Sequence, residues 1–204
     1  FRRPPRLSLA IRGVGGQGNL FFGKVLAQVA FLAGYDDRNI LKGETHGMAQ
    51  MGGPVISTFG CGEVFSPALV PGTANVLIAM EKAEVLRPGF LDLLEPGGTV
   101  LMADTRILPH GLKPEAYPSD EAIAAQLEGY RVVSVDGLSI ALNLGDPKGR
   151  CANVAMLGVL STLPPFDVVP EAVWLQALRG ISRKPALWDL NHAAFMAGRG
   201  MQKG

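Results

Sequence analysis

The glycine-rich segment 13–18 has the residue types of an anion-binding loop. It reads Gly-Val-Gly-Gly-Gln-Gly, follows the short apolar run 7–11, and precedes apolar residues at helical spacing. Gly13 permits a tight turn, Gly15 lets a backbone or a ligand approach closely, and Gly18 lets a helix start against the strand. Unpaired N–H groups at the helix start would then face the loop. A phosphate site, an interface and a packed turn all fit this pattern.

A second polar segment, 42–54, is rich in glycine and in hydrogen-bonding side chains and poor in core residues. Between two strands of an α/β sheet, such a segment is expected at the carboxyl edge, where ligands and partners bind. We expect neither a central strand nor a long helix here, although 45–51 could form one or two helical turns. His46 could serve as a general base or, with Glu44, as a metal ligand, but a hydrogen-bonded histidine at an interface is the simpler interpretation.

Two more polar residues adjoin apolar elements. Glu81 follows the continuous apolar strand 75–80. It could belong to a site at the carboxyl end of that strand, or it could cap the next helix through the first-turn amides. Asn153 lies near the start of the apolar helix 152–160. Helix capping is the simpler interpretation of Asn153, and a buried polar site is the alternative.

Dinucleotide binding requires an acidic residue at the end of the second strand, about 20 residues beyond the glycine loop. Asp36 and Asp37 lie near that distance, but they precede the apolar pair Ile40-Leu41 and do not follow it. This order argues against a stand-alone nucleotide-binding Rossmann protein, which remains an alternative of another functional class.

The composition predicts a packed globular domain. The 204 residues are 48% hydrophobic and 18% charged, so the surface is rather apolar and a partner is expected to cover part of it. Lys and Arg number 19 and Asp and Glu 18, which provides no field for nucleic acid. No segment approaches the ~20 apolar residues that span a bilayer. Cys61 and Cys151 are too few for an iron–sulfur cluster or a structural zinc site from this chain alone, and a reducing cytoplasm is expected.

The order of the elements predicts one α/β, Rossmann-like domain, a mostly parallel sheet covered by helices on both faces, over 7–204, with 1–6 as a tail or linker. Strands are expected at 7–11, 39–41, 55–59, 75–80, 99–103 and 131–135. Helices are expected at 22–32, 89–94, 121–127, 138–144, 152–160, 171–178 and 187–197, with a turn at 95–98 and a surface loop at 104–120.

Taken together, these segments resemble the gamma domain of the 2-oxoacid:ferredoxin oxidoreductases. The segment 13–18 resembles the opening loop of that family, and 44–53 resembles its second and most distinctive signature. Residues 66–67, 77–81 and 153–158 resemble later blocks, so the match covers nearly the whole chain. A free-standing chain of this size is most similar to the beta subunits of the indolepyruvate ferredoxin oxidoreductases.

The resemblance implies an enzyme that oxidatively decarboxylates aryl 2-oxoacids, such as indolepyruvate and phenylpyruvate, to aryl-acetyl-CoA and CO2. That enzyme uses thiamine diphosphate, Mg²⁺, [4Fe–4S] clusters and coenzyme A, and it reduces ferredoxin. A large alpha subunit would carry the cofactors in a hetero-oligomer. This chain would bind none of them alone, would contribute no catalytic or metal-ligating residue, and would shape the active site, with a possible contact to coenzyme A. A gamma subunit for pyruvate, 2-oxoglutarate or branched-chain 2-oxoacids and a purely structural subunit are the alternatives.

The resemblance also implies which residues face a cofactor or the partner. They are Gly13, Gly15, Gly16, Gln17, Gly18, Glu44, Thr45, His46, Gln50, Gly52, Gly53, Glu81 and Asn153. The chain departs from the family pattern at Met51, where arginine is usual, and at Asn75, where aspartate is usual. Without the guanidinium at position 51, a bidentate contact to an anion or carboxylate is lost.

Overall fold

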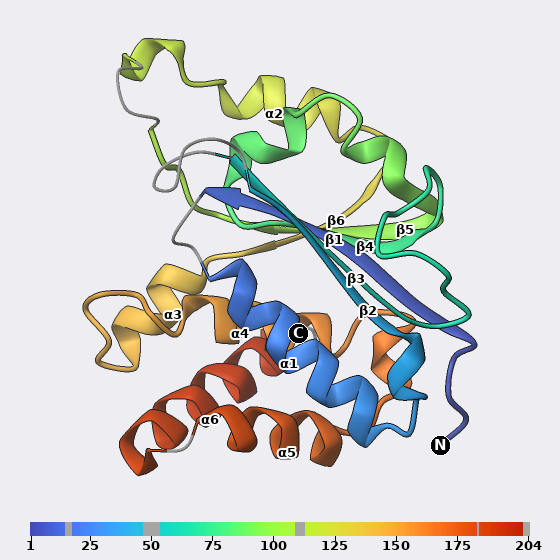
Figure 1. The fold of residues 1–204 in the computed structure, drawn as a ribbon. Coiled ribbons are helices and arrows are strands. Elements are labelled where there is room, and N and C mark those ends of the chain that lie inside the picture. The colour runs from blue at the N-terminus through green and yellow to red at the C-terminus, as the bar shows by residue number, and fades with distance from the viewer. Residues whose placement is uncertain (15–17, 47–53, 109–112, 183, 202–204) are drawn as a thin grey trace.

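A computed structural model describes residues 1–14, 18–46, 54–108, 113–182 and 184–201 (Figure 1). These residues form a six-stranded sheet in the order β2-β3-β1-β4-β5-β6. The strands are β1 (Arg6–Val14), β2 (Ile40–His46), β3 (Pro54–Gly62), β4 (Ala74–Ala79), β5 (Leu94–Ala103) and β6 (Arg131–Val135). Strands β1, β4, β5 and β6 are parallel, whereas β3 runs antiparallel to both β1 and β2. The mostly parallel sheet is therefore confirmed, with one antiparallel strand inserted beside β1.

Helices cover both faces of this sheet (Figure 1). The α-helices are α1 (Asn19–Leu32), α2 (Asp120–Gln126), α3 (Gly137–Asn143), α4 (Ala152–Leu160), α5 (Glu171–Ile181) and α6 (Pro185–Gly200). Short 3₁₀ helices are η1 (Asp37–Asn39), η2 (Lys82–Leu86), η3 (Leu91–Leu93), η4 (Pro114–Ala116) and η5 (Phe166–Val168). In Figure 1, α2 lies on one face of the sheet, and α1, α3, α4, α5 and α6 lie on the other.

Strand β4 packs against the helical layers on both faces of the sheet. All its residues are buried, as expected for a strand that is covered on both sides. Val76 and Ile78 belong to the core beneath α1 and α4, while Leu77 and Ala79 belong to a second core with Phe90 of the opposite layer. The alternation follows from the two-residue period of a strand.

Helix α4 is held close to α6 by two glycines. A Cβ on Gly158 would overlap the carbonyl oxygen of Phe195, and one on Gly198 would overlap that of Ala155. Trp174 of α5 is fully buried between Phe166 and Phe195, at ring-centroid distances of 6.4 and 6.3 Å. Trp174 therefore serves as a packing anchor between α5, α6 and the segment before α5. This packing fixes where the first turn of α4 lies.

Strand β2 is longer than the sequence pattern indicated. It continues to His46 and pairs along its length with β3, so Glu44, Thr45 and His46 lie in a strand and not in a polar loop. Strand β2 lies at the edge of the sheet, which agrees with the expectation that this segment is not a central strand. Polar residues are tolerated on an edge strand because one side of it faces solvent. The helical turns expected at 45–51 are wrong for Thr45 and His46, which lie in β2, and the remainder, 47–51, falls outside the described residues.

The region before β5 also differs from expectation. The helix predicted at 89–94 is a single 3₁₀ turn, η3, and β5 begins at Leu94. The turn predicted at 95–98 lies within β5, where the register with β4 shifts between Ala74 and Val76. Gly97 has φ +79°, a conformation that glycine adopts without steric cost. The chain therefore forms an irregularity within β5 at the position where a turn was expected.

Candidate functional site

A cavity of about 610 Å³ opens at the carboxyl ends of the parallel strands. We call it the carboxyl-edge cavity. Gly18 follows β1, Met80 follows β4, Thr105 follows β5 and Gly137 follows β6, and all four line it together with Asn153 of α4. The carboxyl edge is where α/β sheets bind ligands, and the volume is within the usual range for small-molecule pockets.

The lining combines cations with apolar side chains. Lys148 and Arg150 lie on the turn before α4, and the side chain of Arg150 is 75% exposed. Further lining residues are apolar: Phe21, Met80, Ala103, Ile107, Leu138, Val154, Met156 and Leu187. A ligand with an anionic group and an apolar arm would match this combination.

Buried Asp146 organises the turn that carries the two cations. It is 2% exposed and accepts hydrogen bonds from the N–H groups of Cys151 at 2.8 Å and Lys148 at 3.3 Å. Its Oδ1 also lies 3.7 Å from Nε of Arg150. Burial opposes ionisation, but the N–H donors outweigh it and lower the pKa of the Asp146 carboxyl. The ionised carboxylate therefore fixes the turn beside the cavity.

Asn153 of α4 contributes a buried polar atom to the wall of this cavity. The N-cap of α4 is Cys151, so the capping interpretation of Asn153 is wrong. Its Nδ2 lies 2.5 Å from where a Cβ on Gly18 would be, and Gly18 has φ +90°. Its Oδ1 is buried and has no hydrogen-bond partner among the described residues. An unsatisfied acceptor at a cavity wall is a place for a ligand donor, so the alternative of a buried polar site stands.

Glu81 lies behind Ile107, which forms part of the wall of the carboxyl-edge cavity. It is 2% exposed and caps η2 by accepting from the N–H of Ala83 at 2.9 Å, which confirms the capping interpretation. Its Oε1 also accepts from the N–H of Ile107 at 3.3 Å and from the hydroxyl of Tyr117. Burial raises the pKa of Glu81 against the opposing effect of these donors, and burial beside this carboxylate raises the pKa of Tyr117.

The structure brings some of the predicted site residues together and separates others. Gly18 and Asn153 line the carboxyl-edge cavity, and Glu81 reaches it through Ile107. Gly13 pairs with Val55 inside the sheet. Glu44, Thr45 and His46 lie on the edge strand β2, which β3 separates from β1. Gly15, Gly16, Gln17, Gln50, Gly52 and Gly53 fall outside the described residues.

Strand register nevertheless brings together the described residues that flank the two predicted loop segments. Val14, the end of β1, pairs with Pro54, the start of β3. His46, the end of β2, pairs with Val55. The residues that flank 15–17 and 47–53 therefore meet at the carboxyl edge of β1, as the sequence pattern predicted.

Sequence reasoning missed the turn 145–149 as part of the site. Asp146 and Lys148 of this turn, and Arg150 directly after it, all contribute to the cavity or to its wall. The available signal was a carboxylate inside a Gly/Pro turn, followed by two cations and an apolar helix. Tyr117 was missed as well, because its partner Glu81 is 36 residues away in sequence.

The described residues provide no metal-binding cluster, and Asp36 does not lie at the end of the second strand. No three His, Cys, Asp or Glu side chains gather among them in a way that could hold a metal ion. Cys61 and Cys151 are free and buried, and burial raises their pKa values to about 12 and about 11. Asp36 caps η1 and binds Arg38 before β2 begins, at the edge opposite the glycine loop. That position does not fit the ribose-binding acid of a dinucleotide site.

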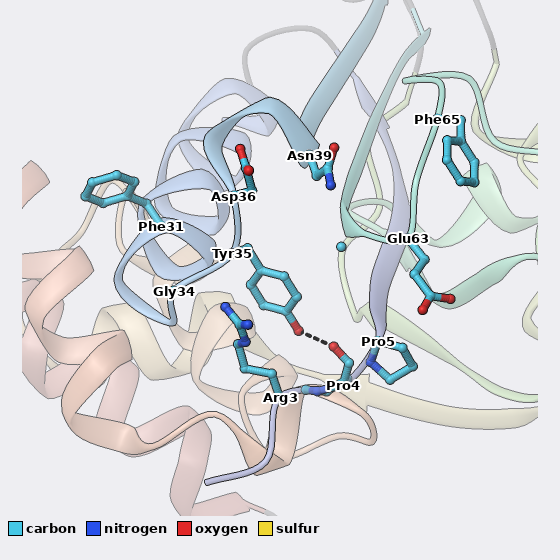
Figure 2. A pocket seen from close by; sticks show the side chains of 11 residues that line it. Arg3, Pro4, Pro5, Phe31, Gly34, Tyr35, Asp36, Asn39, Glu63 and Phe65 are labelled. Carbon is cyan, nitrogen blue, oxygen red and sulfur yellow. Dashed lines mark hydrogen bonds between the residues drawn. The ribbon is translucent and has the colours of Figure 1, made fainter.

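A larger cavity of about 880 Å³ lies at the opposite edge, beneath the N-terminal segment (Figure 2). We call it the amino-edge cavity. Figure 2 shows the Tyr35 hydroxyl pointing to the carbonyl oxygen of Pro4, to which it donates a hydrogen bond of 2.8 Å. The guanidinium carbon of Arg3 lies 5.3 Å from the Tyr35 ring centroid. Phe65 at its rim is 98% exposed.

Comparisons with known proteins agree with this fold. The family model for pyruvate ferredoxin/flavodoxin oxidoreductase matches residues 8–201. Indolepyruvate oxidoreductase subunit IorB of Archaeoglobus fulgidus is 35% identical over 76% of either chain, and that of Thermococcus kodakarensis is 33% identical over 94% of this chain and 93% of the relative.

Among solved structures, a 2-oxoglutarate:ferredoxin oxidoreductase from Magnetococcus marinus, with 2-oxoglutarate, coenzyme A and succinyl-CoA bound, superposes with a TM-score of 0.70. The two sequences are 18% identical, and the match covers 98% of this chain and 32% of that chain. This likeness shows the fold. No helix among the described residues has the length and apolar character needed to cross a membrane.

Proposed function

The chain belongs to the pyruvate ferredoxin/flavodoxin oxidoreductase family, and from that premise we propose that it is the small, gamma-type subunit of an indolepyruvate ferredoxin oxidoreductase. Its homologues are subunits of 2-oxoacid:ferredoxin oxidoreductases. Support for the aryl substrate class is the identity of 33–35% to subunits named for indolepyruvate.

The proposed reaction converts an aryl 2-oxoacid and coenzyme A to aryl-acetyl-CoA and CO2, with two electrons passed to ferredoxin. Thiamine diphosphate, Mg²⁺ and [4Fe–4S] clusters supply the decarboxylation and electron transfer when bound. The described residues do not fit these groups, because they offer no metal-binding cluster and the chain has only two cysteines. We assign them to a large alpha subunit in a hetero-oligomer, and the cysteine usage supports a cytoplasmic location.

Coenzyme A is the component that we assign to this chain, at the carboxyl-edge cavity. The observation that carries the assignment is the buried Oδ1 of Asn153, which has no hydrogen-bond partner among the described residues, in a cavity that Lys148 and Arg150 flank. The two cations would neutralise phosphate charge, and Asn153 Oδ1 would accept from an amide or hydroxyl donor. Apolar residues such as Met80 and Met156 would pack against the pantetheine arm and exclude water.

Copurification and turnover test this function. The native complex should contain a companion chain with thiamine-diphosphate domains and cysteine-rich cluster motifs, identified by mass. That complex should reduce ferredoxin fastest with indolepyruvate among indolepyruvate, pyruvate, 2-oxoglutarate and a branched-chain 2-oxoacid. The isolated chain should fold without catalysing the reaction. Full turnover by the isolated chain, or a clear preference for pyruvate, would refute the proposal.

A further inference from the structure

The cavity wall formed by Thr105 and Ile107 begins the segment 104–120, which leaves β5 and returns at α2. Asp104 is held by a hydrogen bond from its N–H to the carbonyl oxygen of Val135, at 2.8 Å. Thr105 is held by a hydrogen bond from the N–H of Lys82 to its carbonyl oxygen, at 2.9 Å. Beyond Thr105, the wall depends on a side chain and not on sheet pairing.

That side chain is Glu81. Through Oε1 it accepts from the N–H of Ile107 near the start of the segment and from the hydroxyl of Tyr117 near its end. Through Oε2 it caps η2 on Ala83, so the carboxylate is fixed relative to β4. Glu81 thus joins Ile107 and Tyr117, near the two ends of the segment 104–120, to the end of β4.

A charged network outside this contact strengthens the closure of the segment. Lys82 Nζ pairs with Asp104 at 2.7 Å and with Asp120 at 3.1 Å. Arg106 pairs with Asp120, and its guanidinium carbon lies 5.6 Å from the centroid of the Tyr117 ring. The carboxylates of these pairs are exposed, so each pair contributes little, whereas the carboxylate of Glu81 is buried.

We propose that Glu81 is a positioning residue that holds the wall at 105–107 and so sets the width of the carboxyl-edge cavity for coenzyme A. The proposal rests on the assignment of coenzyme A to this cavity. Glu81 touches no ligand itself. Its loss would let Ile107 move and would weaken ground-state binding, with the chemistry on the partner left unchanged.

Glu81→Ala tests the proposal in the assembled complex. Alanine provides no side-chain acceptor, so the contacts to Ala83, Ile107 and Tyr117 are all lost. We expect amide hydrogen exchange at Ile107 to accelerate about tenfold and the KM for coenzyme A to rise about tenfold, the usual effect of losing one hydrogen bond to a charged group. The kcat at saturating coenzyme A should stay within about twofold.

Two further variants make the test specific. Tyr117→Phe removes one donor to Glu81 and leaves the Ile107 bond. The exchange rate at Ile107 and the KM for coenzyme A should therefore both rise, by less than in the Glu81 variant. Ser119→Ala removes the N-cap of α2, where the hydroxyl accepts from Ala122 at 3.2 Å without touching Glu81, and should leave both readouts unchanged. A merely structural role would reduce the amount of active complex without raising this KM.

Unchanged exchange at Ile107 in Glu81→Ala, or faster exchange with an unchanged KM for coenzyme A, would overturn the positioning role alone. Failure of the proposed function has a different signature. In that case coenzyme A would not slow exchange at 145–153 of the unmodified complex, and the positioning role would fall with the cavity assignment.

Discussion

The two cavities lie at opposite edges of one sheet, and the smaller of them has the features of a ligand site. The amino-edge cavity has about 880 Å³, but its buried Tyr35 already donates to Pro4 and its Asp36 already binds Arg38 (Figure 2). The carboxyl-edge cavity has about 610 Å³ and is lined by Asn153, whose Oδ1 has no hydrogen-bond partner in the part of the chain that the structure describes. A polar group that the described protein leaves unsatisfied is therefore a better sign of a ligand than volume.

Glycine substitutions at the two edges should produce the largest contrast. Gly18 and Gly62 both have positive φ, at +90° and +85°. A Cβ on Gly62 would overlap the backbone oxygen of Pro5, whereas one on Gly18 meets only the side-chain end of Asn153. We expect Gly62→Ala to lower the free energy of unfolding by about 3 kcal/mol or more and Gly18→Ala by about 1–2 kcal/mol, measured by denaturant unfolding.

The effects of these two substitutions on the KM for coenzyme A should have the opposite order. Gly18→Ala should raise the KM of the complex for coenzyme A, because it displaces Asn153. Gly62→Ala should leave the KM of the folded fraction unchanged. A rise in KM for Gly62→Ala alone would reverse the roles that we give the two cavities.

Asp146→Asn should have the next largest effect. An asparagine cannot supply two carboxylate acceptors to Cys151 and Lys148, so the turn beside the cavity should loosen. We expect a loss of about 1–3 kcal/mol in the free energy of unfolding and a rise of about tenfold in the KM for coenzyme A. Asp36→Asn, at the amino-edge cavity, is the matched control and should change neither quantity appreciably.

Acidification should remove the contribution of the Asp146 carboxylate to the free energy of unfolding. The pKa of Asp146 is lower in the folded protein than its ordinary value of 3.8, so its contribution to stability is complete above that value and is lost as pH falls through the folded-state pKa. The stability difference between the unmodified protein and Asp146→Asn should therefore shrink below about pH 4 in unfolding curves recorded as a function of pH. A difference that grows on acidification would contradict the assigned ionisation.

Removing an exposed cation should have a smaller effect. Arg150→Ala should raise the KM for coenzyme A by about threefold to fivefold at low salt, and the increase should shrink at high salt because exposed charges are screened. Arg38 is similarly exposed but lies at the amino edge, bound to Asp36. Equal effects of Arg150→Ala and Arg38→Ala would indicate a general charge effect and not a site.

Tyr35→Phe should have the smallest effect. It removes one hydrogen bond to the Pro4 carbonyl and leaves the ring in place, so the expected loss is about 1 kcal/mol of unfolding free energy. Steady-state kinetics of the complex should not change. A change in the KM for any substrate would assign function to the amino-edge cavity.

The fold was largely predictable because local patterns determined it. The apolar run of β4, the glycine loop before α1 and the spacing of α4 each identify an element from neighbouring residues. The errors arose where pairing partners are distant. Glu44 belongs to β2 because β3 pairs with it, and the irregularity of β5 depends on its register with β4.

The site was predictable only in part, for the same reason. Gly18 and Glu81 follow strands, and the carboxyl-edge rule locates residues in that position. Asp146 and Tyr117 act through buried hydrogen bonds to residues whose proximity only the fold creates, as with Tyr117 and Glu81. Asn153 looked like a cap because its position near a helix start fits that role, and only the packing of α4 shows its oxygen without a donor.

Hydrogen exchange of the assembled complex, with and without coenzyme A, tests the central claim most directly. We predict that coenzyme A slows amide exchange at 105–107 and 145–153, around the carboxyl-edge cavity, and leaves 31–36 and 62–65 at the amino edge unchanged. Protection confined to the amino edge, or no protection anywhere on this chain, would contradict the account.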